Sequence, residues 1–141
     1  MKLITIAISA AMLATAPAEA SERRHEYEAR MKNARDVHFT NNCGNPVRLA
    51  MRYRDMHGQW VTGGWWQFAG RDDAYLTRSS TGRRVATDHN VVYYYAETTR
   101  GQRSTWSGGY RNRLGGTMLN MKEKRLRERR KGTYALRISC D

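Results

Sequence analysis

The fold is decided within residues 41–95, which contain four patterned segments. Their sequences are NNCGNP (41–46), VRLAMRY (47–53), QWVTGGWW (59–66) and VVYYY (91–95). The first has the composition of a tight turn, because Gly and Asn tolerate positive φ and Pro resists helix formation. The second alternates apolar and basic residues, the period of a strand with one buried face. We therefore expect a turn followed by strands.

The alternation also predicts which side chains share a face. In residues 47–54 the apolar side chains face inward, and Arg48, Arg52 and Arg54 face outward with Ala50. In residues 59–68 the period places Trp60, Trp66 and Phe68 on one face, with Val61 and Trp65 on the other. The pair Gly63-Gly64 inside this strand indicates a bulge or a close approach of another backbone. Residues 91–98 carry bulky side chains on both faces, as a central strand does.

The remaining segments complete a mainly all-β fold. Alternating patterns predict further strands over residues 36–40, 74–77 and 132–140. Six to seven short strands separated by turns are typical of a small antiparallel β-sandwich or barrel, here a single domain over residues 36–141.

Two short helices are expected beside the strands. The charged segment 21–35 predicts a short N-terminal helix or an extended arm. Near the C-terminus, Asn120 and Glu123 fit a capping box, and no breaker follows before Gly132. This predicts a short, very basic helix over residues 121–131.

The first 20 residues have the features of a secretory signal peptide. Lys2 precedes an apolar run over residues 3–13, and the segment ends with the small residues of Ala18-Glu19-Ala20. The run is too short to cross a membrane, for which about 20 apolar residues are needed. We expect cleavage after Ala20 and a periplasmic or secreted protein without a transmembrane segment. An uncleaved N-terminal anchor is the alternative.

The two cysteines, Cys43 and Cys140, both lie outside the predicted signal peptide. An even cysteine count in an exported protein favours a disulfide, and only one intramolecular pairing exists. The alternative is two free buried thiols. No Cys or His spacing typical of a metal site is present, and no cofactor is expected.

The charge of the chain indicates its partners. Lys and Arg number 25 against 13 Asp and Glu, a net charge of +12. A basic surface attracts polyanions with strong salt dependence. Outside the cytoplasm these are anionic envelope lipids and acidic glycans; an acidic protein partner also fits, whereas nucleic acid is less available there.

The predicted anion-binding residues fall into two groups, and a merely solvated basic face is the alternative for both. One group is the outward arginines of residues 48–54, and the other is the dense basic segment of residues 122–131. The candidates are Arg48, Arg52, Arg54, Lys122, Lys124, Arg125, Arg127, Arg129, Arg130 and Lys131. Arginine dominates the chain's basic residues, and its planar fork pairs bidentately with phosphate and carboxylate. In a helix, Glu123 and Glu128 would offset part of the second group through pairs four residues apart.

The same motifs resemble a known family. The cysteine turn at Cys43, the strand of residues 47–53, Gly64-Trp65-Trp66, the segment 93–96 and Trp106-Ser107-Gly108 are similar to bacterial exported proteins with the domain of unknown function 1036. The resemblance covers about residues 36–108. It implies a small β-rich exported protein and no established activity, so no catalytic residue follows from it. Asp72 and Asp73 stand where the pattern would have a cysteine.

No sequence motif predicts an enzyme, and a non-enzymatic module is the favoured interpretation. A lectin-like module is one alternative, with outward-facing Trp65 and Tyr94 stacking on sugar rings. A small secreted hydrolase is another, using Asp88 and His89 with the help of Asp72. The favoured hypothesis is an exported β-domain whose basic face binds anionic envelope components or an acidic partner.

Overall fold

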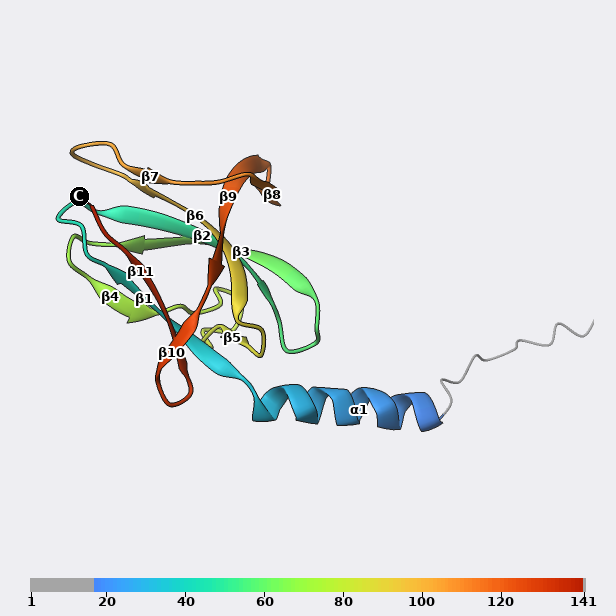
Figure 1. The fold of residues 1–141 in the computed structure, drawn as a ribbon. Helices are drawn as coiled ribbons and strands as arrows, with labels where there is room; N and C mark the ends of the chain where they lie inside the picture. The colour runs from blue at the N-terminus through green and yellow to red at the C-terminus, as the bar shows by residue number, and fades with distance from the viewer. Residues whose placement is uncertain (1–16, 141) are drawn as a thin grey trace, which may run out of the picture.

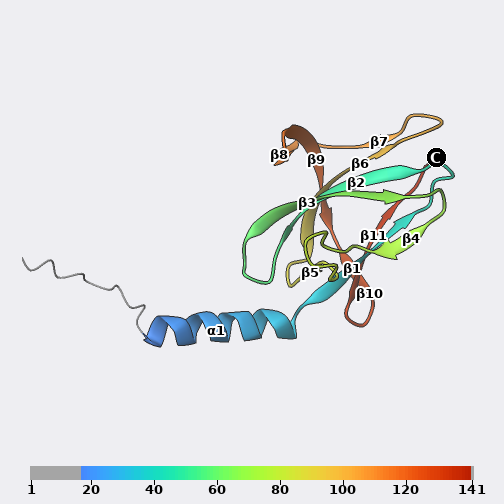
Figure 2. The ribbon, with the colours of Figure 1, turned by 180° about the vertical axis from the view of Figure 1, so that it is seen from behind.

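The computed structural model describes residues 17–140, which form one helix followed by eleven strands. Helix α1 spans Pro17–Lys32, and it extends away from the strands (Figures 1 and 2). The strands, in chain order, are β1 (Arg35–Asn41), β2 (Val47–Arg54), β3 (Trp60–Phe68), β4 (Asp73–Tyr75), β5 (Ala86–Thr87), β6 (Val91–Thr98), β7 (Thr105–Trp106), β8 (Tyr110–Leu114), β9 (Thr117–Arg125), β10 (Arg127–Arg130) and β11 (Thr133–Ile138). The expected all-β class is confirmed, with more and shorter strands than predicted.

The strands form two sheets whose connection runs through β9 and β10. The first sheet has the order β10-β11-β1-β4, with β5 also paired to β1. The second has the order β3-β2-β6-β9-β8, with β7 also paired to β6. Between β9 and β10 the chain passes from the second sheet to the first at Leu126, which is buried in the main core (Figure 1). The sheets are curled, so the architecture lies between a sandwich and a half-barrel.

The main core lies between the two sheets and is built from the predicted alternating positions. Strand β2 contributes its inward residues Val47, Leu49, Met51 and Tyr53. The other sheet contributes residues such as Phe39 of β1. The described core members are Val37, Phe39, Val47, Leu49, Met51, Tyr53, Phe68, Leu76, Val85, Val92, Tyr94, Ala96, Leu126, Leu136 and Ile138. Burial of this apolar surface supplies the main driving force for folding.

The predicted bulge lies in β3 and changes which tryptophans share a face. Leu49 pairs with Trp66 and Met51 with Gly63, so β3 has one extra residue between these pairs. At Gly64, φ is +138°, and an added Cβ would lie 3.0 Å from the carbonyl oxygen of Leu49. Only glycine fits this position without strain.

Because of the extra residue, the predicted grouping of Trp60 with Trp66 is wrong. Trp66 and Val61 pack against the main core, whereas Trp60 contacts Tyr93 on the opposite face of the sheet with a ring separation of 5.7 Å. A one-residue shift moves every following side chain to the other face. Trp65 lies on the outer face as predicted, in a second small cluster around Ala50, Leu119 and Met121.

The predicted helix over residues 121–131 is wrong, because this segment forms β9 and β10. Strand β9 pairs with β6 on one side and with β8 on the other, and β10 pairs with β11. Backbone hydrogen bonds to three strands replace those of a helix. The sequence did carry a signal for this, since Leu119 and Met121 are two residues apart and both are buried on one face of β9.

Helix α1 confirms a helix in the predicted N-terminal segment 21–35 and begins before it. None of its residues is buried, and its clearest contact is the Tyr27 ring stacked on that of His57 at 5.3 Å. The predicted signal peptide lies mostly on residues 1–16, outside the described residues, and its predicted cleavage point after Ala20 falls within α1. Among the described helical residues, none forms a stretch long and apolar enough to span a bilayer.

The first and last strands of the β-domain are joined in two ways. Strand β1 pairs in parallel with β11, and a disulfide links Cys43 to Cys140, as the sequence predicted. The buried Asn41 orders the turn after β1: its side-chain NH₂ donates to the backbone oxygens of Asn45 and Ala69, and its oxygen accepts from the backbone N–H of Cys43. The turn of residues 41–46 is therefore tied to the chain after β3 through Ala69 and to the chain after β11 through the disulfide.

The disulfide should contribute a large part of the net stability. It closes a loop with a sequence separation of 97 residues, for which the chain-entropy model predicts roughly 4–5 kcal/mol. We expect the Cys43→Ala/Cys140→Ala variant to lose that amount in urea denaturation, with a lower midpoint. Reduced wild-type protein should match the variant, and an unchanged free energy of unfolding in both samples would contradict the prediction.

Candidate functional site

Strand alternation separates the charges of the basic segment. Lys122 and Lys124 lie opposite Tyr94 and Val92 of β6, whereas Glu123 lies opposite Tyr93. Because directly opposed residues share a face, Glu123 is on the outer face of the sheet and the two lysines are on the other. The Glu123 carboxylate accepts a hydrogen bond of 2.9 Å from the Tyr110 hydroxyl on that outer face.

The second acidic residue of the segment, Glu128 of β10, is also engaged elsewhere. Its carboxylate pairs with the Arg35 guanidinium at 3.1 Å and accepts a hydrogen bond of 2.6 Å from the backbone N–H of Gly132. The Gly132 N–H and then Arg35 lower the pKa of Glu128 below its ordinary value. Glu128 therefore stays ionised but neutralises Arg35, not the bases around it.

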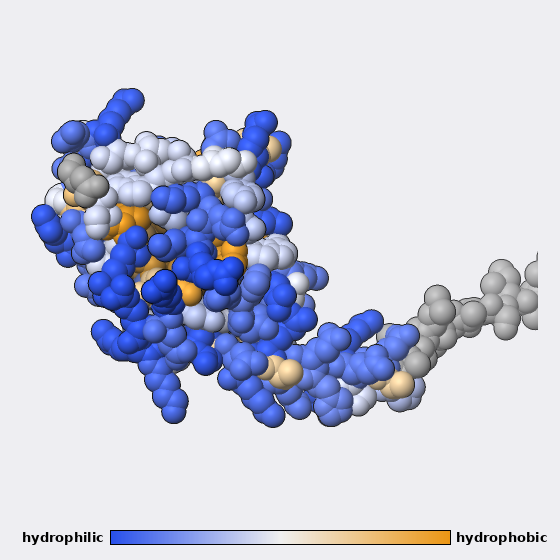
Figure 3. All heavy atoms as spheres, viewed as in Figure 1, coloured by the Kyte–Doolittle hydropathy of each residue, from blue (hydrophilic) through white to orange (hydrophobic). Residues whose placement is uncertain are grey.

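A groove of about 500 Å³ lies where β9, β10 and β11 meet, and we call it the basic groove. Its basic lining residues are Lys122, Lys124, Arg125, Arg127, Arg129 and Arg137, and Glu123 and Ala135 complete it. Within residues 17–140, none of these six bases lies within ion-pair distance of a carboxylate. Figure 3 shows strongly hydrophilic side chains over this region of the surface, with apolar side chains visible between them. The groove thus has six basic side chains and one carboxylate, that of Glu123, and its net charge is strongly positive.

The groove contains five of the seven predicted basic residues of segment 122–131. Arg130 and Lys131 belong to the exposed end of β10 and the turn after it and do not line the groove. Arg137, which the sequence analysis missed, comes from β11, whose residue Ala135 lies opposite Arg127. Its outward position follows from the alternation of β11, but its neighbours follow only from the strand pairing.

The predicted arginines of β2 lie on the outer face of the second sheet, and two of them are neutralised. Arg54 pairs with Asp88 at 3.3 Å. Arg48 pairs with Glu97, its Nε donating to Oε1 at 2.7 Å. Arg52 donates to the Thr62 hydroxyl at 3.3 Å, a neutral partner. These arginines therefore do not join the basic groove as one binding surface.

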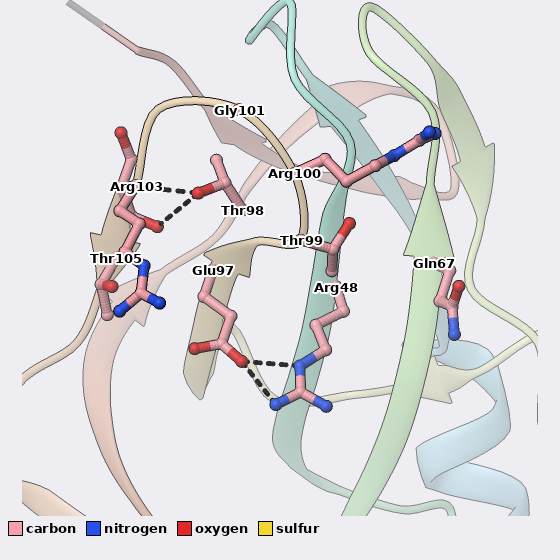
Figure 4. A pocket seen from close by; sticks show the side chains of 10 residues that line it. Arg48, Gln67, Glu97, Thr98, Thr99, Arg100, Gly101, Arg103 and Thr105 are labelled. Carbon is pink, nitrogen blue, oxygen red and sulfur yellow. Dashed lines mark hydrogen bonds and ion pairs between the residues drawn. The ribbon is translucent and has the colours of Figure 1, made fainter.

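The Arg48–Glu97 pair forms part of a second, polar hollow of about 630 Å³, which we call the Arg48–Glu97 cavity. Figure 4 shows Arg48 beside Glu97, with Gln67 of β3 on one side and Arg103 on the other. The full lining comprises Arg48, Gln67, Glu97, Thr98, Thr99, Arg100, Gly101, Arg103, Ser104 and Thr105. Hydroxyl, amide and charged groups dominate it.

The charge state of Glu97 is set by its neighbours. Burial alone would raise its pKa, but hydrogen bonds from the Tyr95 hydroxyl and Arg48, with the charges of Arg48 and Arg103, hold the pKa below its ordinary value. The Tyr95 hydroxyl donates to Glu97 Oε2 at 2.7 Å. Burial and this hydrogen bond raise the pKa of Tyr95 to about 12. At neutral pH the cavity therefore contains the Glu97 carboxylate anion and arginine cations, and the neutral Tyr95 phenol hydrogen-bonds to that carboxylate.

The two predicted stacking residues differ in access. Tyr94 is 4 % exposed and packs in the main core, so it offers no ring face to a ligand, and this prediction is wrong. Along β6 the side chain of Tyr94 points to the face opposite that of Tyr93 and Tyr95, and the Tyr94 face is the buried one. Trp65 is partly exposed, but the Arg48 guanidinium lies 4.0 Å above its ring and the Tyr95 ring contacts it edge-on.

Asp88 and His89, which the hydrolase alternative would use, do not form an acid–base pair through any described contact. Asp88 binds Arg54, whereas the His89 ring contacts Trp60. The sequence analysis missed a different pair, in which His38 Nε2 lies 3.0 Å from Asp73 Oδ1. Thr40 and Asp73 are opposite each other in the β1–β4 pairing, so His38 and Asp73 are brought together by strand register.

Within residues 17–140, no group of three or more His, Cys, Asp or Glu side chains is arranged to hold a metal ion. The His38–Asp73 pair lies at the sheet surface, and no described nucleophile contacts it. A histidine that activates a nucleophile has to lie within hydrogen-bond distance of that nucleophile.

Comparison with known proteins gives no relative. No protein-family model matches the chain, and no curated protein and no solved structure shows significant similarity to it. The resemblance to the exported family with the domain of unknown function 1036 therefore stays a prediction.

The Arg48–Glu97 pair should make stability depend on pH. Because the folded state lowers the pKa of Glu97, the stabilisation is present above the ordinary pKa of 4.5 and is lost as the pH falls through the folded-state value. We expect Arg48→Met to cost about 1 kcal/mol or less at pH 7 and to flatten this acid loss, measured as the free energy of unfolding against pH. Arg129→Met is the control, and an equal flattening there would contradict the assignment.

Proposed function

We propose that this chain is an exported, non-enzymatic β-domain whose basic groove binds anionic lipid or glycan of the cell envelope. The observation that supports this most directly is the groove between β9, β10 and β11. Six basic side chains line it, and none of them is paired with a described carboxylate. Such an arrangement leaves guanidinium and ammonium donors available to an external anion.

The strand conformation of the segment strengthens the proposal. In a helix, Glu123 would stand one turn from Arg127, and Lys124 one turn from Glu128, and each pair would neutralise itself. In β9 and β10 the two glutamates instead bind Tyr110 and Arg35. In the groove, six bases therefore stand beside one carboxylate, that of Glu123, and the excess positive charge favours a bound polyanion.

The composition of the groove favours phosphate or carboxylate groups as the bound chemistry. Four of its six bases are arginines, which bind both groups through two parallel hydrogen bonds. Lys122 and Lys124 add point charges beside them. Phospholipid headgroups, lipopolysaccharide phosphates and acidic glycans share this chemistry, and an acidic protein surface would compete for the same groups.

Two features support an envelope location. The Cys43–Cys140 disulfide is of the kind that persists in oxidising compartments. The pattern of residues 1–20 predicts export. The proposed resemblance to exported proteins with the domain of unknown function 1036 also favours export, and it implies no enzymatic activity.

The groove should be required for salt-sensitive binding. We expect wild-type protein to be retained on heparin and on phosphatidylglycerol vesicles at low salt and released at high salt, because bound counterions are exchanged for protein charges. Arg127→Gln/Arg129→Gln should elute from heparin at clearly lower salt and bind vesicles at least about tenfold more weakly, since each lost anion contact is worth more than 1 kcal/mol.

A matched charge change tests whether position matters. Arg23→Gln/Arg24→Gln removes the same two charges from α1, whose residues are exposed. If this control shifts elution as much as the groove variant, binding follows net charge and the groove has no special role. If wild-type protein is not retained at low salt on either support, the proposed function is wrong.

A further inference from the structure

The two cysteines of the Cys43–Cys140 disulfide differ in their access to solvent. Cys43 has 0 % of its surface exposed, whereas Cys140 is exposed. The difference follows from their places in the chain, because Cys43 lies in the turn between β1 and β2, and Cys140 follows the end of β11 at Ile138. These two segments lie side by side at one edge of the domain (Figures 1 and 2). A reagent in solution therefore meets the disulfide from the Cys140 side.

Cys43 is enclosed by the chain that follows β3. Its backbone carbonyl accepts a hydrogen bond of 2.8 Å from the Arg71 N–H, and its own N–H donates to the Asn41 side chain at 3.0 Å. Gly70 lies so close to the Gly44 carbonyl that a Cβ at Gly70 would clash with it. Cys43 can reach solvent only when the turn of residues 41–46 separates from residues 69–71, which breaks these contacts.

Cys140 has no comparable cover. The β1–β11 ladder ends with the pair of Asn41 and Ile138, so Cys140 lies beyond the last ladder pair. Its Sγ lies 3.9 Å from the hydroxyl of Ser104, which can donate to it. A sulfur atom is a weak acceptor, so this contact holds Cys140 only weakly.

Access decides which sulfur reacts in thiol–disulfide exchange. A thiolate attacks one sulfur of a disulfide, forms a new S–S bond with it and displaces the other sulfur as a thiolate. Attack at Cys43 requires the turn to open first, and that opening costs the free energy of local unfolding. Attack at Cys140 requires no such opening, so it is the faster route.

We propose that Cys140 is the exchange site of the folded protein, and that it forms the mixed disulfide with an external thiol, in particular that of a dithiol oxidoreductase. Cys43 is the buried sulfur that leaves in this step and attacks in the reverse step. The inference does not rest on the basic groove or on anion binding, because neither cysteine lines the groove.

Reduction proceeds in two displacements. In the first, the thiolate of the reductant bonds to Cys140 Sγ, the bond to Cys43 breaks, and its electron pair goes to the Cys43 sulfur, which takes up a proton. In the second, the other thiol of the reductant, as a thiolate, attacks the reductant's own sulfur in the mixed disulfide and releases the Cys140 sulfur, which takes up the second proton. The protein gains two electrons and two protons, and the dithiol becomes a disulfide.

The β1–β11 ladder allows the exchange to occur within the folded domain. Its six residue pairs hold β11 in place after the disulfide opens, with Phe39 opposite Leu136 in the core. Cys140 lies beyond the ladder and can move with the external thiol attached, whereas Cys43 stays in its turn. The buried Cys43 thiol is thereby protected from a second reagent and remains positioned to close the bond again.

The first test maps the mixed disulfide in the wild-type full chain. Folded, oxidised protein is incubated with excess glutathione as the probe thiol, quenched with acid, alkylated with N-ethylmaleimide in mildly acidic denaturant and digested for mass spectrometry. We expect glutathione on Cys140 and the maleimide on Cys43, in at least about tenfold excess over the opposite arrangement, because attack at Cys43 requires the turn to open. The same reaction in urea, where both sulfurs are accessible, should give the two arrangements in similar amounts.

Single-cysteine variants measure the same difference as rates. Cys43→Ala leaves the Cys140 thiol, which we expect to react with dithiobis(nitrobenzoic acid) in the folded protein almost as fast as in urea. Cys140→Ala leaves the Cys43 thiol, which should react at least about tenfold more slowly than in urea, since its turn has to open. Circular dichroism checks that each variant is folded, and if Cys140→Ala does not fold, the wild-type mapping decides alone.

The outcomes separate this inference from the proposed function. Glutathione found equally on both cysteines of the folded wild type, or mainly on Cys43, would overturn the assignment. A Cys43 thiol that reacts in folded Cys140→Ala as fast as in urea would overturn it as well. None of these results affects the groove, because heparin and vesicle retention are measured with the disulfide intact, and a failure of retention in turn leaves the exchange site unaffected.

Discussion

The parallel pairing of β1 with β11 is the constraint on which the rest of the domain depends. It brings the first and last strands of the β-domain side by side over six residue pairs, with Phe39 opposite Leu136 in the core. The Cys43–Cys140 disulfide lies just beyond the last pair, and the side-chain amide of Asn41 donates to Asn45 within the adjoining turn and to Ala69 after β3. Because both ends are held at one place, the chain between them has to return to the strand at which the β-domain began.

One result of this closure is that the basic segment is extended. The chain leaves the second sheet at β9, must reach β11 beside β1, and passes through Leu126 and β10 to do so. Extended backbone places Lys122 and Lys124 on one face and Glu123 on the other. In a helix, Glu123 and Glu128 would instead offset part of this charge through pairs four residues apart. The charge of the groove is therefore a consequence of topology as much as of composition.

A second result is the composition of the outer face of the second sheet. Alternation along β2 and β6 points Arg48, Tyr95 and Glu97 to the same face, and the register of the pairing decides that Arg48 lies directly opposite Glu97. The bulge at Gly64 then places Trp65 under the Arg48 guanidinium. A polar cavity and a basic groove thus lie on different strands, and each has its own electrostatic character.

The sequence by itself determined the β class, the inward faces of β1, β2 and β11, the disulfide partners and the bulge, because each rests on a local period or on the single pairing of two cysteines. It misassigned residues 121–131, where dense charge concealed the alternation of Leu119 and Met121, and it grouped Trp60 with Trp66 because one extra residue reverses the faces. Only the tertiary structure decided which side chains meet across strands. The pairing of Glu128 with Arg35 away from the basic groove, and the contact of Arg48 with Glu97, depend on strand pairing between distant segments, which no local pattern specifies.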